Sequence, residues 1–189
     1  MIFELDRAIF LFFNQAAHIS SFVDRLICFF GSNYSILAAA ALAIIWYFFV
    51  ASHAKEKSIK KLVQILFMVI MATVLARFVI AEPLRFFLDR TRPFEVIEGA
   101  RQIIAHSGGH AFPSGHASAA FAIASSLGYF IPQARWFLLS IAILNAISRV
   151  AGGVHWPSDV IAGAAIGILS AFIEAWANKF LWFSKKSIS

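Results

Sequence analysis

Long apolar runs separated by short polar stretches dominate the pattern of this chain. A helix needs about 20 consecutive, mainly apolar residues to cross the hydrocarbon core of a bilayer. Five runs approach that length, and the fourth does so only if Ser148 and Arg149 complete its last turn. The runs cover residues 34–51, 62–81, 115–131, 136–147 and 160–177. They predict five transmembrane helices, with Pro83 shaping the end of the second and Pro113 preceding the start of the third.

The first 30 residues do not fit this pattern, because charged and amide side chains such as Asp6, Arg7 and Asn14 recur among the apolar ones. One or two short interfacial helices are the better interpretation, with a sixth, poorly apolar span as the alternative. The fold class expected is therefore all-α, a polytopic membrane bundle of five to six transmembrane helices. We expect a single domain over residues 1–189, with 1–30 as the N-terminal interfacial segment and 34–183 as the transmembrane bundle.

The charged residues between the runs predict an orientation. Residues 52–61 carry four lysines against one glutamate, which marks this loop as cytoplasmic by the positive-inside rule. If the spans alternate from there, three polar stretches fall on the extracytoplasmic face. These stretches are Arg85–Pro93, Pro113–His116 and Ser148–Asp159. We expect them to converge into one site at that face.

Composition supports a membrane protein and argues against a nucleic-acid binder. The chain is 60% hydrophobic and 14% charged, with a mean hydropathy of +0.78, whereas soluble domains average about a quarter charged residues. The net charge of +6 is dispersed and does not form a basic face. The single cysteine, Cys28, lies in an apolar stretch, where we expect it to be buried; it allows no internal disulfide and no cysteine metal cluster.

Arg85, Arg92 and Arg149 all belong to the three polar stretches. An arginine fork donates paired hydrogen bonds to phosphate oxygens and keeps its charge, so three of them predict a site for a tetrahedral dianion. Taken singly, each could instead snorkel to lipid headgroups. Arg90 is interpreted as a charge at the rim of the site. Arg77 lies in the second predicted span and is a functional candidate for which the sequence names no partner.

Pro113–His116 (P-S-G-H) stands where the third span begins. The first backbone N–H groups of a helix have no internal partners and bind anions. Gly115 would let a phosphate approach the backbone, and the Ser114 hydroxyl would add a donor. His116, in the first turn, could give a proton to a leaving oxygen. His106 and His110 lie in the preceding polar loop and are expected to be solvated.

His155 and Asp159 stand four residues apart near the start of the fifth span. The carboxylate could accept the proton of one imidazole nitrogen and leave the other free as a nucleophile or base. A helix-capping aspartate beside an incidental histidine is the structural alternative. A metal bound by His116, His155 and Asp159 is disfavoured, because neighbouring arginines would repel it. We therefore expect neither a metal nor another cofactor.

At these positions the sequence resembles the type 2 phosphatidic acid phosphatase (PAP2) superfamily, membrane lipid phosphatases related to vanadium haloperoxidases. The family pattern is K-x6-R-P, then P-S-G-H, then S-R-x5-H-x3-D. Residues 113–116 and 148–159 match the second and third parts, and Arg85-x6-Arg92-Pro93 matches the first with arginine in place of lysine. The match covers roughly residues 85–159.

The resemblance implies a metal-independent phosphatase with a phosphohistidine intermediate. His155 would attack phosphorus, Asp159 would orient it, and His116 would protonate the leaving oxygen and then activate water. The resemblance implies that the phosphate oxygens are held by Arg85, Arg92, Ser114, Gly115 and Arg149.

The small size and short loops are similar to bacterial undecaprenyl-diphosphate phosphatases of the superfamily, so the expected substrate is that lipid. The expected location is the bacterial cytoplasmic membrane, with the site facing outward. Phosphatidylglycerophosphate or lipid A phosphatases of the same mechanism are the second choice. A lipid phosphotransferase is a closer rival than a non-catalytic transporter or scaffold, because a mere binder needs the arginines but not the nucleophile.

Overall fold

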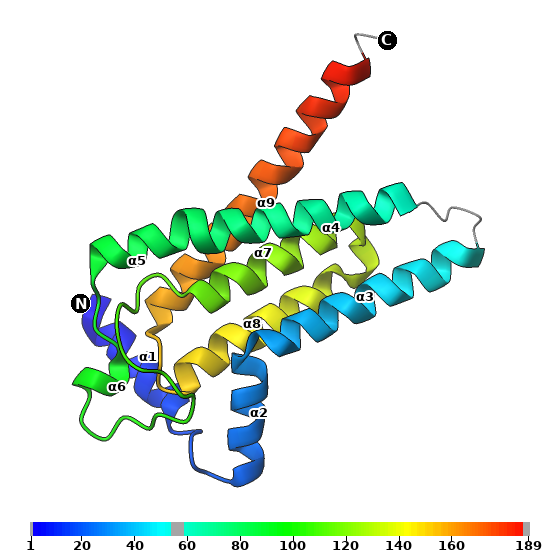
Figure 1. The fold of residues 1–189 in the computed structure, drawn as a ribbon. Coiled ribbons are helices and arrows are strands. Elements are labelled where there is room, and N and C mark those ends of the chain that lie inside the picture. Colours follow the sequence, from blue (N-terminus) through cyan, green and yellow to red (C-terminus); the bar gives the residue numbers. More distant parts are fainter. Residues whose placement is uncertain (1, 54–58, 187–189) are drawn as a thin grey trace.

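The computed structural model describes residues 2–53 and 59–186, and every regular element in these ranges is helical (Figure 1). The all-α prediction is confirmed. The elements are α1 (Ile2–Asn14), α2 (Ser21–Gly31), α3 (Asn33–His53), α4 (Ile59–Val74), the π-helical turn η1 (Leu75–Ala81), α5 (Glu82–Leu88), α6 (Pro93–Val96), α7 (Gly115–Phe130), the 3₁₀ turn η2 (Pro132–Ala134), α8 (Arg135–Ala151) and α9 (Pro157–Lys186).

The centre of the bundle is α7, which packs against α3, α4, α8 and α9. Twelve of its sixteen residues are buried, and most of them are alanine, glycine or serine. Small side chains let neighbouring helix backbones approach closely, which is how membrane helices gain van der Waals contact without a hydrophobic driving force. The site residue His116 therefore lies on a helix that neighbours fix on several sides.

The G-x-x-x-G pair of α9 makes the closest of these approaches. A methyl group on Gly163 would lie 2.5 Å from the Ser114 carbonyl oxygen, and one on Gly167 would lie 2.5 Å from that of Ser118. Any larger residue would push α9 away from α7. This close packing joins the P-S-G-H segment to the helix that carries Asp159.

Fewer helices than expected meet the length and apolarity that a membrane crossing requires. In the described ranges three do so, over Ile59–Val96, Pro132–Ala151 and Pro157–Lys179. The number becomes four if α2 and α3, which meet at 66°, form one broken span. The central helix α7 has only 16 residues and is too short to be counted. These apolar helices support an integral membrane protein.

Two helix ends test the sequence prediction. Helix α8 runs to Ala151, so Ser148 and Arg149 do complete its last turn, which is the condition on which the length of the fourth span depended. Pro83, in contrast, does not end the second span, which continues to Leu88. A proline clashes with the carbonyl four residues back in a regular helix. Here the π-helical turn η1, in which the Glu82 N–H bonds to the Arg77 carbonyl, widens the helix just before the proline.

The N-terminal 30 residues form two short helices, α1 and α2, which is one of the predicted arrangements. Both lie at the end of the bundle that also carries α6 (Figure 1). The Asn14 side chain fixes the end of α1 by donating to the carbonyls of Arg101 and Ala151, each at 2.8 Å. Cys28 is exposed, and the expectation that it is buried was wrong. Helix α2 buries its neighbours Ile27 and Gly31 and leaves Cys28 at the surface.

Candidate phosphate site

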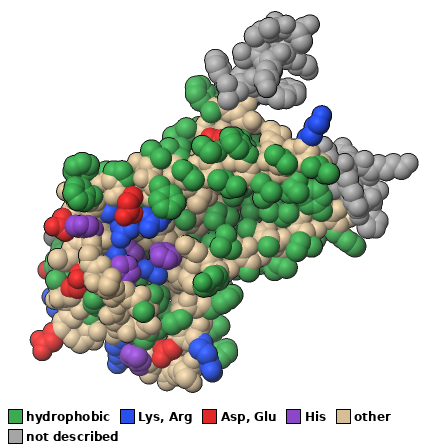
Figure 2. Space-filling view, in the orientation of Figure 1, with side chains coloured by type: hydrophobic (Ala, Val, Ile, Leu, Met, Phe, Trp, Pro, Cys, Tyr) green, Lys and Arg blue, Asp and Glu red, His purple; other side chains and the backbone are tan. Residues whose placement is uncertain are grey.

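The three predicted polar stretches meet at one end of the bundle. Arg92 precedes α6, His116 lies in the first turn of α7, and His155 lies in the turn between α8 and α9. Figure 2 shows the arginine and histidine side chains gathered there, beside a flank covered by hydrophobic side chains. Three segments distant in sequence are thus brought together.

Asp159 is fully buried at the start of α9, and both of its carboxylate oxygens are engaged. Oδ2 lies 3.4 Å from Nδ1 of His155 and accepts a hydrogen bond from the Trp156 backbone N–H at 2.8 Å. Oδ1 accepts from Nη1 of Arg90 at 2.6 Å. The carboxylate therefore stabilises the turn before α9 and faces the imidazole at the same time.

The environment of His155 assigns its tautomer. Nε2 lies 3.4 Å from Nη1 of Arg92, and a guanidinium can only donate. Nε2 therefore presents its lone pair, and the ring proton belongs on Nδ1, which faces the carboxylate. Burial lowers the pKa of His155 well below its usual range, and the positive charges of Arg149 and Arg92 lower it further. The imidazole is neutral at neutral pH, as a nucleophile must be.

One loop carbonyl holds two of the predicted arginines. The His110 oxygen accepts from Nη2 of Arg92 at 3.1 Å, and from Nε and Nη2 of Arg85 at 3.3 and 3.1 Å. Arg92, which is fully buried, also donates from Nη1 to the Val154 carbonyl at 2.6 Å. The loop before α7 therefore fixes both cations of the R-x6-R-P segment beside the histidine turn.

Arg149 is the third arginine, and it is 2% exposed. Its Nη1 donates to the Gly31 carbonyl at 3.2 Å, while its buried Nε has no partner within the described ranges. With His116 it lines a groove of about 550 Å³ beside the junction of α2 and α3. An oxyanion bound in this groove would satisfy the Nε donor. The arrangement can hold a tetrahedral anion against a neutral imidazole.

Comparisons with known proteins agree with this site. A family model described as the PAP2 superfamily matches residues 61–182, which is more than half of the chain. The chain belongs to the PAP2 superfamily. It is 27% identical to the bacitracin transport permease protein BcrC of Bacillus licheniformis, over 98% of this chain and 87% of the relative.

Two further matches also span most of the chain. Undecaprenyl-diphosphatase BcrC of Bacillus subtilis (strain 168) is 28% identical, over 92% of this chain and 82% of the relative. The crystal structure of Aquifex aeolicus LpxE matches with a TM-score of 0.67 and 26% identity, over 92% of this chain and 93% of the other. The PAP2 fold is therefore supported by sequence and by structure.

Two PAP2 motif residues lie differently from what the sequence suggested. Ser114 caps α7, because its hydroxyl accepts from the Ala117 N–H at 3.5 Å; the hydroxyl proton is still available to a ligand. The space in front of Gly115 holds the guanidinium of Arg77, whose Cζ would lie 2.6 Å from a methyl group at Gly115. The glycine thus makes room for an arginine from another helix, where we had expected a phosphate.

Arg90 is not a rim charge, as the sequence had suggested, because it lies between two buried carboxylates. Nη1 pairs with Asp159 and Nη2 pairs with Asp6 of α1, each at 2.6 Å. Asp6 also accepts from the Ser158 backbone N–H at 2.8 Å and from its hydroxyl at 2.5 Å. Motif spacing could not identify Asp6, since 153 positions separate it from Asp159; its only sequence signal was a charge in an apolar segment.

The two loop histidines also differ from the expectation that they are solvated. His106 is half-buried, and burial together with the charges of Arg92 and Arg149 lowers its pKa to about 4. His110 is partly exposed, and its Nδ1 lies 2.5 Å from Oδ1 of Asp89. Within the described ranges, no three histidine, cysteine or acidic side chains are grouped as a metal would require.

Proposed function

We propose that the protein is a membrane-embedded phosphatase that removes the terminal phosphate of undecaprenyl diphosphate through a phosphohistidine on His155. The observation that carries the proposal is the buried, neutral imidazole held between the Asp159 carboxylate and the Arg92 guanidinium. The diphosphatase name of the Bacillus subtilis relative, which matches over most of the chain, supports this choice of substrate.

In the first step, the lone pair on Nε2 of His155 attacks phosphorus. The bond from phosphorus to the bridging oxygen breaks, and its electron pair leaves with undecaprenyl phosphate. The proton on Nδ1 stays in the hydrogen bond to Asp159, which stabilises the positive charge that develops on the ring. Arg85, Arg92 and Arg149, with Ser114 and the first N–H groups of α7, would hold the phosphate oxygens as charge redistributes.

In the second step, water hydrolyses the phosphohistidine. His116 enters the first step as the imidazolium and gives that proton to the leaving oxygen. The neutral imidazole then accepts a proton from water as the water oxygen bonds to phosphorus, which restores the imidazolium. The nitrogen–phosphorus bond breaks, its electron pair returns to Nε2, and inorganic phosphate departs. His116 is suited to both roles because it lines the same groove as Arg149, at the edge of the buried site.

Position 85 holds an arginine where the family pattern has a lysine. The arginine keeps the positive charge and adds a planar guanidinium fork. That fork already donates to the His110 carbonyl through two nitrogens, so the remaining Nη1 is the group that faces other anions. A lysine ammonium would serve both groups from one nitrogen, whereas the guanidinium serves them from separate nitrogens in a fixed fork. We propose that Arg85 contacts substrate through this nitrogen.

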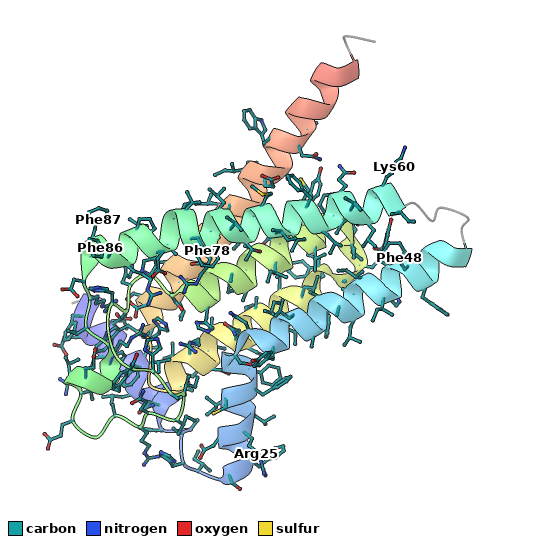
Figure 3. The ribbon with its side chains drawn as sticks, viewed as in Figure 1. Arg25, Phe48, Lys60, Phe78, Phe86 and Phe87 are labelled. Carbon is teal, nitrogen blue, oxygen red and sulfur yellow. The ribbon has the colours of Figure 1, made fainter. Side chains whose placement is uncertain are left out.

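We further propose that the protein lies in a bacterial cytoplasmic membrane with this site facing outward. Lys60 lies at the far end of the bundle from the phosphate site (Figure 3), as expected if the lysine-rich loop is cytoplasmic. The transport name of the other relative suggests a different class of function. The presence of His155, His116 and Asp159 favours hydrolysis, because transport does not require a nucleophile.

The test is inorganic phosphate release by the detergent-purified protein in excess chelator, from undecaprenyl diphosphate and from phosphatidylglycerophosphate. We expect chelator-resistant release, faster from the diphosphate and abolished by His155→Ala. His18→Asn, which changes an exposed histidine at the same end, is the control and should keep full activity. Preference for phosphatidylglycerophosphate would overturn the substrate, and release only on addition of an acceptor lipid would indicate a phosphotransferase.

A further inference from the structure

A fourth arginine, which no PAP2 motif includes, reaches the phosphate site from the second long helix. Arg77 belongs to the π-helical turn η1, and its guanidinium lies against Gly115 at the start of α7. π turns are frequent where a helix re-aims a functional side chain. The unsubstituted Gly115 is what permits the contact, because a methyl group there would lie 2.7 Å from Nε of Arg77 and 2.8 Å from its Nη1.

Arg77 and Arg85 share one carboxylate. Oε2 of Glu82 accepts from Nη1 of Arg77 in a very short contact and from Nη1 of Arg85 at 3.1 Å. The Glu82 side chain is 53% exposed, whereas those of Arg77 and Arg85 are 24% and 15% exposed. Two well-covered cations thus converge on an anionic group that can rotate out into solvent. The carboxylate oxygen lies between the two guanidinium groups and accepts from both.

This anion position adjoins the proposed reaction site. Arg85 donates through Nη1 to Glu82 and through Nη2 to the His110 carbonyl, which also holds Arg92. Arg92 in turn lies beside His155. Arg85 therefore belongs both to the position of the Glu82 carboxylate and to the reaction site beside His155. This is the arrangement expected for two phosphates joined by a single bridging oxygen. The buried Nε of Arg149 has no partner in the described ranges, so one donor near the reaction site remains for a further acceptor.

The neighbouring surface is apolar. Phe78, whose ring lies 5.4 Å from the Arg77 guanidinium, is exposed, and so are Phe86 and Phe87 farther along the same helix (Figure 3). A lipid diphosphate has its hydrocarbon chain on the phosphate that does not react. Arg77 lies eight residues before Arg85, toward the middle of the long helix, so it lies on the side from which such a chain would extend.

We propose that Arg77 and Arg85 form a second phosphate subsite, which binds the lipid-linked phosphate of a diphosphate while the terminal phosphate reacts at His155. Glu82 fills the subsite when no diphosphate is present and moves aside when one binds. This inference rests on the proposed function and deepens it, because it assigns the preference for diphosphates over monophosphates to residues outside the PAP2 motifs.

The first experiment measures binding of inorganic pyrophosphate and of inorganic phosphate to the detergent-purified protein by calorimetry. It does not depend on turnover, so it can succeed or fail separately from the proposed function. We expect pyrophosphate to bind more tightly than phosphate. Arg77→Gln should weaken the binding of pyrophosphate roughly tenfold, the scale of one lost charge-assisted contact, and leave the binding of phosphate nearly unchanged. Arg25→Gln, at an exposed position on α2 (Figure 3), is the matched control and should change neither.

Glu82→Gln supplies an independent result if Arg77→Gln fails to fold. Removing the competing negative charge should tighten pyrophosphate binding and lower the KM for undecaprenyl diphosphate, with little effect on phosphatidylglycerophosphate. A purely structural Arg77–Glu82 pair predicts the opposite: both variants melt at lower temperature, and both anions weaken equally or not at all. Weaker pyrophosphate binding in Glu82→Gln, or equal effects on the two anions, would overturn the subsite.

Discussion

At the scale of single residues, Asp159 shows how one side chain can serve several partners. Its carboxylate faces the His155 imidazole, accepts the Trp156 N–H and pairs with Arg90. The sequence offered orientation of His155 and helix capping as alternatives. The Asp159 carboxylate does both, because its two oxygens have several lone pairs that reach different donors.

Asp159→Asn should leave the fold intact and lower kcat for phosphate release by roughly 10³- to 10⁴-fold, the loss seen when a triad aspartate becomes an amide. The amide NH₂ cannot accept the Nδ1 proton, so the ring is left in the wrong tautomer for attack through Nε2. Glu98→Gln, which removes an exposed carboxylate at the same end, is the control. Turnover within a few-fold of the wild type would show that Asp159 only caps the helix.

At the scale of elements, α1 is attached to the site through one buried carboxylate. Asp6 accepts from Ser158 at the start of α9 and from Arg90, which itself pairs with Asp159. The N-terminal helix therefore contributes to the environment of the proposed catalytic pair. Its predicted position in the membrane interface stays a prediction.

Asp6→Asn should lower the free energy of unfolding by about 1–3 kcal/mol, because charged hydrogen bonds to Ser158 and Arg90 are weakened. The change should also slow turnover, since Asp159 would then be the one carboxylate paired with Arg90 in the described ranges. Thermal unfolding in detergent and phosphate release measure the two effects. Glu4→Gln, an exposed carboxylate on the same helix, should change neither. If the two variants have the same melting temperature, α1 is not fixed by Asp6.

At the scale of the whole molecule, charge divides the two ends of the bundle. Arginine and histidine side chains gather around the phosphate site, and hydrophobic side chains cover the adjoining flank (Figure 2). The lysine-rich loop joins α3 to α4, and its residues 54–58 lie outside the described ranges. The separation of the phosphate site from the lysine-rich loop supports the proposed orientation, with the site outward and the loop in the cytoplasm.

Cysteine labelling in intact cells tests that orientation. A cysteine at position 108 should react with an impermeant thiol reagent from outside, and one at position 57 should react only after the membrane is opened. Both belong in a Cys28→Ser background, because Cys28 is exposed at the end that carries the site. A separate sample that keeps Cys28 and carries no added cysteine is the positive control and should label from outside. The reverse pattern would place the site in the cytoplasm and exclude an extracytoplasmic diphosphate substrate.

The linear pattern determined the helical class, most helix bounds and the segments that carry the site. Apolar runs and helix-ending residues act locally, so the start of α7 after Pro113 and the body of α8 followed directly. Pro83 was misread because a π turn, which has no simple sequence signal, accommodates it. The motif spacing also brought His155, Arg92 and Arg149 into one expected site.

Only the tertiary structure decided which charges meet across helices. Asp6 reaches Arg90, Arg77 reaches Gly115, and the positive charges of Arg92 and Arg149 act on His106, although nothing in their spacing connects them. Such contacts depend on how separate elements pack, and a buried charge is stable only where packing supplies its partner. The sequence therefore determined which chemistry this membrane protein carries, and the packing of its helices determined how that chemistry is held and which charges surround it.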